Sequence, residues 1–214
     1  MKNGFNHISA EMAQSALRYF QGFMPEFTVT DLQSLLQYCQ IRKFPRKAKL
    51  VEEGEVDDYL NLVLSGLVRK YVRSNTKEQT LQLATEGHLV HSELSFLTRQ
   101  PSLAILETLE PTLLLSLRFD KMEEALEHFP QGERMGRLML TAMYIKKDER
   151  RYARASKTVR ELFMDYVAHH PHMLQRVPQK YLASYLNIKP ETFSRLKHLG
   201  RKPQKINGSS KNLT

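Results

Sequence analysis

The chain has 214 residues and a mass of 25.0 kDa, with 41% hydrophobic and 26% charged residues, a composition typical of a globular protein with one large or two modest domains. No apolar run approaches the roughly 18 residues of a membrane-spanning helix, and the first residues show no secretory signal pattern, so we expect a cytoplasmic protein with no membrane partner. The single cysteine, Cys39, excludes an internal disulfide and cannot by itself hold an iron–sulfur cluster.

The positive charge lies in the C-terminal third of the chain. The net charge is +9; residues 1–145 carry 16 Lys or Arg against 18 Asp or Glu, whereas residues 146–214 carry 16 against 5. This asymmetry favours an acidic partner, and nucleic acid rather than a membrane because the basic third has no wide apolar face. The alternative is that these charges only solvate the surface.

The first 40 residues have the apolar spacing of helices. This spacing predicts one helix at residues 9–21 and a second at residues 29–39, capped by Thr30 or Asp31.

From about residue 41 to residue 119 the apolar period becomes that of short strands. The runs are separated by turn-forming residues at Gly54, Ser65-Gly66, Gly87 and Glu110-Pro111. The segment therefore predicts a meander of hairpins that closes into an antiparallel roll or barrel.

The helical period returns after Phe119. The segment FDKMEEALEHF predicts a short helix that ends before Pro130, and residues 132–156 predict an unbroken helix of about seven turns. Heptad positions a and d of the long helix are mostly apolar and predict a homodimer interface: Met135, Leu138, Ala142, Ile145 and Tyr152, with Glu149 as the polar exception. The alternative is a single helix buried within one protomer, and the neighbouring Met139 and Met143 could face the roll.

The last part of the chain predicts three further helices. Thr158 and Glu161 form a capping box for the first, which ends at the HHPH segment, residues 169–172. The segment PQKYLASYLNIKPETFSRLK then predicts two short helices joined at Asn187, because asparagine tolerates a left-handed conformation. Pro190 suits the first turn of the second helix.

The exposed start of that second helix has the chemistry needed to bind DNA in the major groove. Arginine can bond to guanine O6 and N7, glutamate can accept from cytosine N4, and lysine neutralises phosphates. Glu191 and Arg195 are four residues apart on one face and predict a base-reading pair; the alternative is an intrahelical ion pair. The remaining predicted DNA-binding residues are polar or basic neighbours: Thr192, Ser194, Lys197, Gln179, Lys180, Lys189 and Arg201.

The order of roll, long helix and helix-turn-helix resembles the Crp/Fnr family of bacterial transcription regulators over nearly the whole chain. KPETFSRLKHL is similar to that family's recognition helix, in which an R-E-T-x-x-R pattern supplies base contacts. Glu191, Thr192 and Arg195 match this pattern, but Pro190 replaces its first arginine. LVEEGEVDDYLNLVLSGLVRKYV is similar to the glycine-punctuated roll, and RVPQKYLASYLNIKPETFSRLK resembles the regulators of Bacteroidetes.

This resemblance implies an α+β fold. It comprises an antiparallel β-roll of the cyclic-nucleotide-binding type (a double-stranded β-helix) with flanking helices, a long dimerisation helix, and a helical, winged-helix-like DNA-binding domain. The expected parts are a sensor roll, the dimerisation helix, the helix-turn-helix and a basic tail, at residues 1–130, 131–156, 157–202 and 203–214. The resemblance also implies a non-enzymatic regulator that binds double-stranded DNA as a homodimer and contacts RNA polymerase. The alternative is a ligand-binding or interaction module that has lost DNA binding.

The segment LVHSELSFLTRQPSLAI departs from the family's nucleotide cradle. In nucleotide-binding members, G-E-[LI] and a downstream R-[ST]-A hold the sugar and the phosphate. Here the glycine falls on His91 or Ser92, the arginine falls on Pro101, Ser102 or Leu103, and Arg99 has the wrong spacing. We therefore predict that cyclic AMP does not bind in the usual way and that no cofactor is present, with the effector left unknown. The candidate effector pocket comprises His91, Ser92, Glu93, Arg99 and Ser102.

The C-terminal segment GRKPQKINGSSKNLT has no strand alternation and so predicts no β-hairpin wing. The tail residues Arg201, Lys202 and Lys205 either reach phosphates or form a solvated end.

No motif in the sequence predicts an enzyme. His88, His91 and Glu93 spell the H-x-x-H-x-E pattern of metal-binding barrels, but residues three apart on a strand face opposite sides, so we predict no metal site. There is no nucleophile elbow, P-loop or dinucleotide-binding motif.

Overall fold

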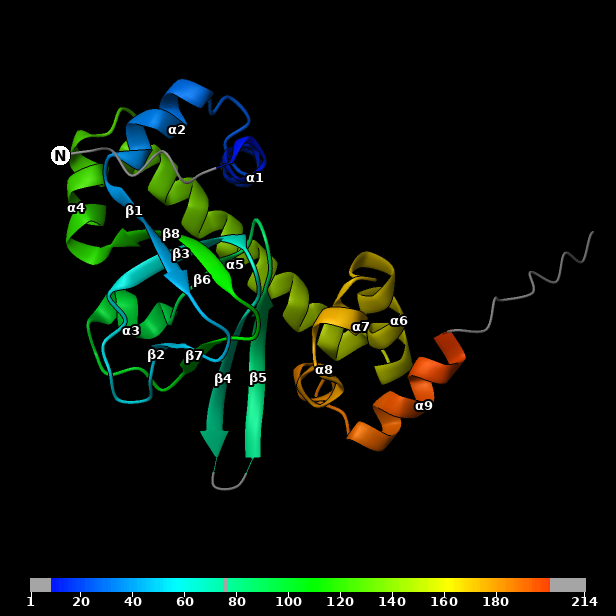
Figure 1. The fold of residues 1–214 in the computed structure, drawn as a ribbon. Helices are drawn as coiled ribbons and strands as arrows, with labels where there is room; N and C mark the ends of the chain where they lie inside the picture. Colours follow the sequence, from blue (N-terminus) through cyan, green and yellow to red (C-terminus); the bar gives the residue numbers. More distant parts are fainter. Residues whose placement is uncertain (1–8, 75–76, 201–214) are drawn as a thin grey trace, which may run out of the picture. The chain divides into compact units, whose positions relative to one another are not determined.

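The computed structural model describes residues 9–74 and 77–200, and the side chains of residues 198–200 are left out of the description (Figure 1). The chain divides after Tyr152 into two compact units, which we describe separately. No helix in the described ranges is both long enough and apolar enough to cross a membrane.

The first unit combines helices with two antiparallel sheets. Its helices are α1 (Ala10–Gln21), α2 (Val29–Leu36), α3 (Glu93–Thr98), α4 (Phe119–His128) and most of α5 (Gly132–Ser156). Its strands are β1 (Cys39–Phe44), β2 (Lys49–Val51), β3 (Tyr59–Ser65), β4 (Val68–Ser74), β5 (Lys77–Ala84), β6 (Leu89–Val90), β7 (Ile105–Thr108) and β8 (Thr112–Arg118). The second unit contains α6 (Val159–His169), α7 (Met173–Arg176), α8 (Gln179–Tyr185) and α9 (Pro190–Gly200).

The strands form a roll of two four-stranded sheets. Sheet A has the order β1-β8-β3-β6 and sheet B the order β2-β7-β4-β5, and the paired strands are antiparallel. The predicted α+β class and antiparallel roll are confirmed, but the meander is wrong. The consecutive strands β3 and β4 lie in different sheets, and the chain crosses between them at Ser65-Gly66.

Gly66 makes this crossing possible. Its φ is 102°, and a Cβ atom at this position would lie 2.6 Å from the carbonyl oxygen of Pro111. Because β-carbon sterics disfavour positive φ, both its conformation and its surroundings require glycine.

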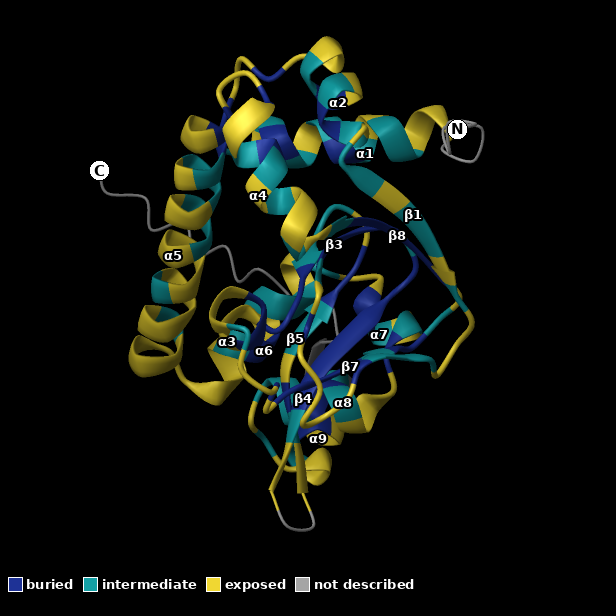
Figure 2. Cartoon of the chain, turned by 90° about the vertical axis from the view of Figure 1, so that its left-hand side faces the viewer, coloured by how far each residue is buried: buried dark blue, intermediate teal, exposed yellow. Residues whose placement is uncertain are grey.

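The two faces of sheet A belong to different apolar cores. On one face, Val63, Val90 and Leu114 of sheet A pack in the interior of the roll against sheet B residues: Val51, Val68, Ala84 and Leu106. The other face packs under the helices, where Leu62, Leu64, Leu113 and Leu115 contact residues of α1, α2, α4 and α5 (Figures 1 and 2). Each fully buried leucine contributes about 1.5–3 kcal/mol to this packing.

Two details of the helices differ from the prediction. The N-cap of α2 is Thr28, not Thr30 or Asp31: the Thr28 hydroxyl accepts from the Asp31 N–H, and the Asp31 carboxylate accepts from the Thr28 N–H. The short helix α3 lies within the segment predicted to be entirely β. Its six residues are too few to show a helical period in the sequence.

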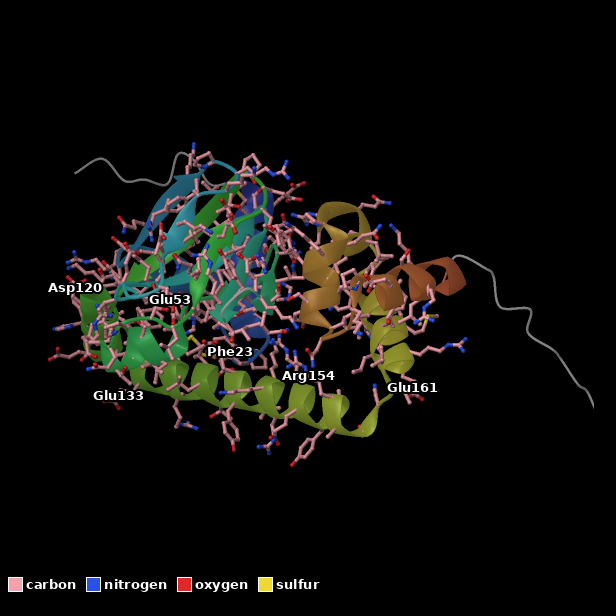
Figure 3. All side chains as sticks on the ribbon, turned by 90° about the horizontal axis from the view of Figure 1, so that it is seen from below. Phe23, Glu53, Asp120, Glu133, Arg154 and Glu161 are labelled. Atoms are coloured by element: carbon pink, nitrogen blue, oxygen red, sulfur yellow. The ribbon has the colours of Figure 1, made fainter. Side chains whose placement is uncertain are left out.

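The long helix α5 is continuous over 25 residues, as predicted. Figure 3 shows Glu133 near its beginning and side chains that project on both the roll side and the opposite side. Met135 is 7% exposed and Leu138 is partly buried, and both pack in the core of their own protomer. Ile145 and Tyr152 are 51% and 62% exposed. The predicted dimer-interface residues of α5 are therefore divided between the core of the protomer and its surface.

The second unit has its own small core around two aromatic rings. Phe163 of α6 and Phe193 of α9 are each 1% exposed, and their rings meet edge to face with centroids 5.3 Å apart. The predicted capping box of α6 is confirmed, because the Thr158 hydroxyl accepts from the Glu161 N–H and the Glu161 carboxylate accepts from the Thr158 N–H. The helix ends at His169, where the HHPH segment begins.

Candidate nucleic-acid interface and effector region

A tight turn joins α8 to α9. Asn187 has a φ of 56°, as predicted, and the Ile188 N–H donates to the Ala183 carbonyl at 2.9 Å. Helix α9 then begins at Pro190, whose missing N–H costs no hydrogen bond in a first turn. The turn thus fixes where α9 begins relative to α8.

Helix α9 is anchored on one side and open on the other. Phe193 is buried against Phe163, and Leu182 and Ala183 of α8 are buried in the same unit. Three residues of the predicted reading face are exposed: Glu191, Ser194 and Arg195. Thr192 is partly buried, and its hydroxyl lies 3.5 Å from the Arg195 guanidinium.

The charges of Glu191 and Arg195 do not neutralise each other. Within the described ranges the structure shows no ion pair between these two side chains, so the alternative interpretation as an intrahelical pair is not supported. Both side chains are exposed on the first two turns of the helix.

The predicted phosphate-binding residues lie in the sequence on both sides of the start of α9. Gln179, Lys180 and Lys189 are exposed, and Lys197 is partly buried. The Lys180 ammonium lies 4.9 Å from the centroid of the Tyr181 ring. Three residues of the predicted basic segment lie outside the described residues: Arg201, Lys202 and Lys205.

In the roll, none of the three positions that could replace the family's phosphate-binding arginine offers a positive charge. Pro101 and Leu103 are exposed. Ser102 is 1% exposed; its hydroxyl donates to the Ala104 carbonyl at 2.7 Å and shares a hydrogen bond of 2.8 Å with the Ser92 hydroxyl. The two predicted serines thus bond to each other.

An ion pair that the sequence analysis missed lies beside them. Lys70 is 6% exposed, and its ammonium donates to the Glu93 carboxylate and, at 3.0 Å, to the His91 carbonyl. Burial alone would raise the pKa of Glu93, but the Lys70 ammonium holds that pKa below its usual value. The sequence does contain a signal for this contact. Residues two apart on a strand point to the same face, so Lys70 lies on the same face of β4 as the buried Val68.

Asp57 is a second missed residue. It is fully buried, and its carboxylate accepts from the Ser92 N–H at 2.6 Å and the Tyr59 N–H at 3.1 Å. Its own N–H donates to the Ser95 hydroxyl at 2.9 Å. Burial raises the pKa of Asp57 even though two N–H groups stabilise the carboxylate. Asp57 therefore holds the start of α3 in place.

Arg99 does not take the place of the missing arginine. It has a φ of 60°, and its guanidinium donates to the Asp57 carbonyl at 2.9 Å and to the Asp58 carboxylate. The same group lies 4.3 Å from the centroid of the Phe119 ring. The Arg99 guanidinium is therefore already bonded to groups of the protein itself.

His91 lies on the opposite face of sheet A from the interior of the roll. Leu89 and His91 flank Val90, which packs in the roll interior, so the two side chains point the other way. The His91 side chain is 3% exposed, and its ring meets Phe96 edge to face at 5.6 Å. Burial lowers the pKa of His91 to about 4, so the ring is neutral at pH 7.

The predicted effector residues thus fall into separate groups. Ser92 and Ser102 meet, Glu93 pairs with Lys70, and His91 and Arg99 point elsewhere. In the described part of the chain, no three His, Cys, Asp or Glu side chains gather where they could hold a metal ion.

Residues 41–129 match the family model described as the cyclic nucleotide-binding domain. The roll of this chain is therefore similar to that domain.

Three solved structures have a similar fold over most of the chain. The Thermus thermophilus catabolite activator protein is 22% identical, with a TM-score of 0.53, and the match covers 83% of this chain and 85% of that chain. The c-di-GMP-responsive global regulator CLP of Xanthomonas campestris is 17% identical, with coverage of 80% and 91% and a TM-score of 0.59. FixK2 of Bradyrhizobium japonicum is 18% identical, with coverage of 75% and 83% and a TM-score of 0.60.

These similarities confirm the predicted roll of the cyclic nucleotide-binding type with flanking helices and a long helix. The first two structures are described as an activator protein and a global regulator. No curated protein matches the chain by sequence.

Proposed function

We propose that the chain is a sequence-specific transcription regulator of the Crp/Fnr type that reads DNA with α9. The observation that carries the proposal is the exposed, mutually unpaired Glu191 and Arg195 on the first turns of a helix whose opposite side is anchored by Phe193. A major groove admits one helix in this way, with its N-terminal residues against the base edges.

The proposed role of each DNA-binding residue follows from its side-chain chemistry. Arg195 can form two hydrogen bonds to one guanine, and Glu191 can accept from cytosine N4, so these two residues specify sequence. Lys180, Lys189 and Lys197 neutralise phosphates, as does Arg201 beyond the described residues, and Gln179, Thr192 and Ser194 position the helix. The excess of 16 basic over 5 acidic residues in residues 146–214 supports this assignment.

We further propose a cytoplasmic homodimer that pairs through the outer side of α5. Large side chains on that side are exposed: Tyr144 at 71%, Ile145 at 51% and Tyr152 at 62%. A second copy of the helix would bury them, with Ala142 allowing close approach. The preferred DNA should then be an inverted repeat with half-sites about 34 Å apart, and the bound dimer would be placed to contact RNA polymerase.

The roll does not bind cyclic AMP in the family's usual way under this proposal. The Lys70–Glu93 ion pair and the Ser92–Ser102 hydrogen bond use the groups that would hold a sugar and a phosphate. None of the three candidate positions for the phosphate-binding arginine is charged.

Selection of bound sites from random DNA with the purified full chain tests the function. The expected result is an inverted repeat whose affinity falls steeply with salt. Arg195→Ala and Glu191→Ala should each reduce the discrimination between bases by about 1–3 kcal/mol per lost contact. Lys197→Ala should instead weaken binding to all sequences and reduce by about 1 the slope of log K against the logarithm of the salt concentration.

Lys43→Ala is a matched control, since Lys43 is an exposed lysine of the roll unit. This variant should leave both affinity and preference unchanged. If the wild-type chain shows no salt-sensitive affinity for any DNA, the function is instead that of an interaction module that has lost DNA binding.

A further inference from the structure

A cavity of about 270 Å³ lies under the helices that cover sheet A. Its floor is the outer face of the sheet, including Leu62 and Leu115, and its walls come from α1, α2, α3, α4 and α5. In the described part of the chain, Tyr19 and His91 are the lining residues with a side-chain nitrogen or oxygen atom. The remaining side chains of the lining are hydrocarbon, thioether or, at Cys39, a thiol.

Of the two polar lining residues, His91 is the more deeply buried, since Tyr19 is only partly buried. The His91 side chain is 3% exposed and lies on the cavity face of β6, yet no hydrogen bond to its ring occurs within the described ranges. The ring nitrogens of His91 are not sealed off from the cavity, so a ligand that fills the cavity could hydrogen-bond to them. Lys70 and Glu93, whose charges act on His91, are bonded to each other and do not bond to its ring.

The walls of the cavity suit ligands of variable shape. Four methionines line it: Met122, Met135, Met139 and Met143. Methionine side chains are flexible and polarisable, and they adapt to irregular apolar surfaces. Small-molecule sites combine such apolar walls with a few polar groups that fix orientation. The half-exposed Leu97 in the lining leaves the cavity open to solvent at one side, so a small apolar molecule can enter it.

The volume and the lining limit the ligand. The cavity has the volume of about nine water molecules at about 30 Å³ each, so the ligand has on the order of ten non-hydrogen atoms. A charged group would lose its hydration among these walls without an opposite charge to replace it. The neutral His91 ring can instead accept a hydrogen bond from a hydroxyl group.

We propose that this cavity binds an uncharged, largely apolar small molecule with one hydroxyl group, such as a short alkylphenol, and that the hydroxyl donates to the imidazole of His91. The site lies on the other face of sheet A from the interior of the roll, and it does not depend on the proposed DNA binding. Helix α5, which forms one wall with Met139 and Met143, is the element that such a ligand would contact directly.

Titration calorimetry on the full chain with 4-propylphenol and with propylbenzene tests the proposal. Both compounds should bind with saturation, and the phenol should bind about three- to tenfold more tightly because of one additional hydrogen bond. His91→Leu should remove this preference while the binding of propylbenzene persists.

Met139→Trp should block both compounds by filling the cavity. The chain contains no tryptophan, so this variant also gives a single fluorophore whose emission reports an apolar environment. Leu103→Trp is the matched control, because Leu103 is 67% exposed and lies outside the lining. This control should keep wild-type binding of both compounds.

Several outcomes would overturn the proposal. Absence of saturable binding to the folded wild-type chain would remove the site, and equal affinities for the two compounds would remove the role of His91. Undiminished binding in a folded Met139→Trp variant would place the ligand elsewhere. A histidine-ligated absorption band after addition of haemin, lost in His91→Leu, would assign His91 to a porphyrin. If His91→Leu does not fold, the comparison of the two compounds on the wild-type chain still decides the role of the hydroxyl.

Discussion

Acid should destabilise the roll through His91. The ring is 3% exposed, and burial lowers its pKa from 6.5 to about 4, so the folded chain resists protonation at pH values where the unfolded chain accepts a proton. Stability from this group is therefore complete above about pH 6.5, declines as the pH falls from 6.5 to about 4, and does not change further below that range.

The difference of about 2.5 pKa units corresponds to about 3 kcal/mol over the whole range, at about 1.4 kcal/mol per unit. About 2 kcal/mol of this should be lost by pH 5, where most unfolded chains but few folded chains carry the proton. Domains are typically stable by about 5–15 kcal/mol, so the loss is large enough to measure.

The assay is urea unfolding of the wild type and of His91→Gln at pH 7 and pH 5, followed by circular dichroism with the transitions of the two units fitted separately. Glutamine does not titrate, so the variant should lose about 2 kcal/mol less than the wild type between the two pH values. Titrating groups distant from His91 are the same in both proteins and cancel in the comparison. Equal losses in the two proteins would show that His91 accepts a proton as easily in the folded chain as in the unfolded one.

Two further predictions concern the roll. Gly66→Ala should destabilise the first unit by more than about 2 kcal/mol, because it adds a clash with a backbone carbonyl at 2.6 Å to the strain of a φ of 102°. In urea unfolding, Gly54→Ala should cost clearly less, since its φ is 91° but no atom lies within 4 Å; equal costs would mean that the crossing is not tightly packed. Micromolar cyclic AMP should leave the melting temperature of the full chain unchanged, and a clear upward shift would show that the pocket binds the nucleotide without the family's arginine.

Local signals in the sequence predicted most elements of the fold but not the pairing of the strands. The helices at residues 10–21 and 132–156, the turn at Asn187 and the break at Ser65-Gly66 follow from apolar period and turn chemistry. The assignment of β3 and β4 to different sheets depends on contacts between residues far apart in the chain. A glycine at a strand break suits a hairpin and a crossing equally well, so the sequence did not distinguish them.

The candidate sites were predictable to different degrees. The exposed face of α9 follows from helical spacing alone, because Phe193 and the neighbouring polar residues alternate with the helical period. The effector region was harder to predict, since Lys70 is far from Glu93 in sequence and approaches it only when the roll closes. The cavity beside His91 was not predicted at all, because it depends on how far α5 stands from sheet A.

The order of strands in sheet A also determines when the roll can form. Strand β8 lies between β1 and β3, and Cys39 of β1 pairs with Leu117 of β8. The hairpin of β4 and β5 is local and can form first, whereas β1 has no partner in the sheet until β8 has been synthesised. At about 5–20 residues per second, the ribosome exposes β1 for several seconds before its partner emerges. Because a long-range closure of this kind folds slowly, β1 stays unpaired in the newly made chain during that interval.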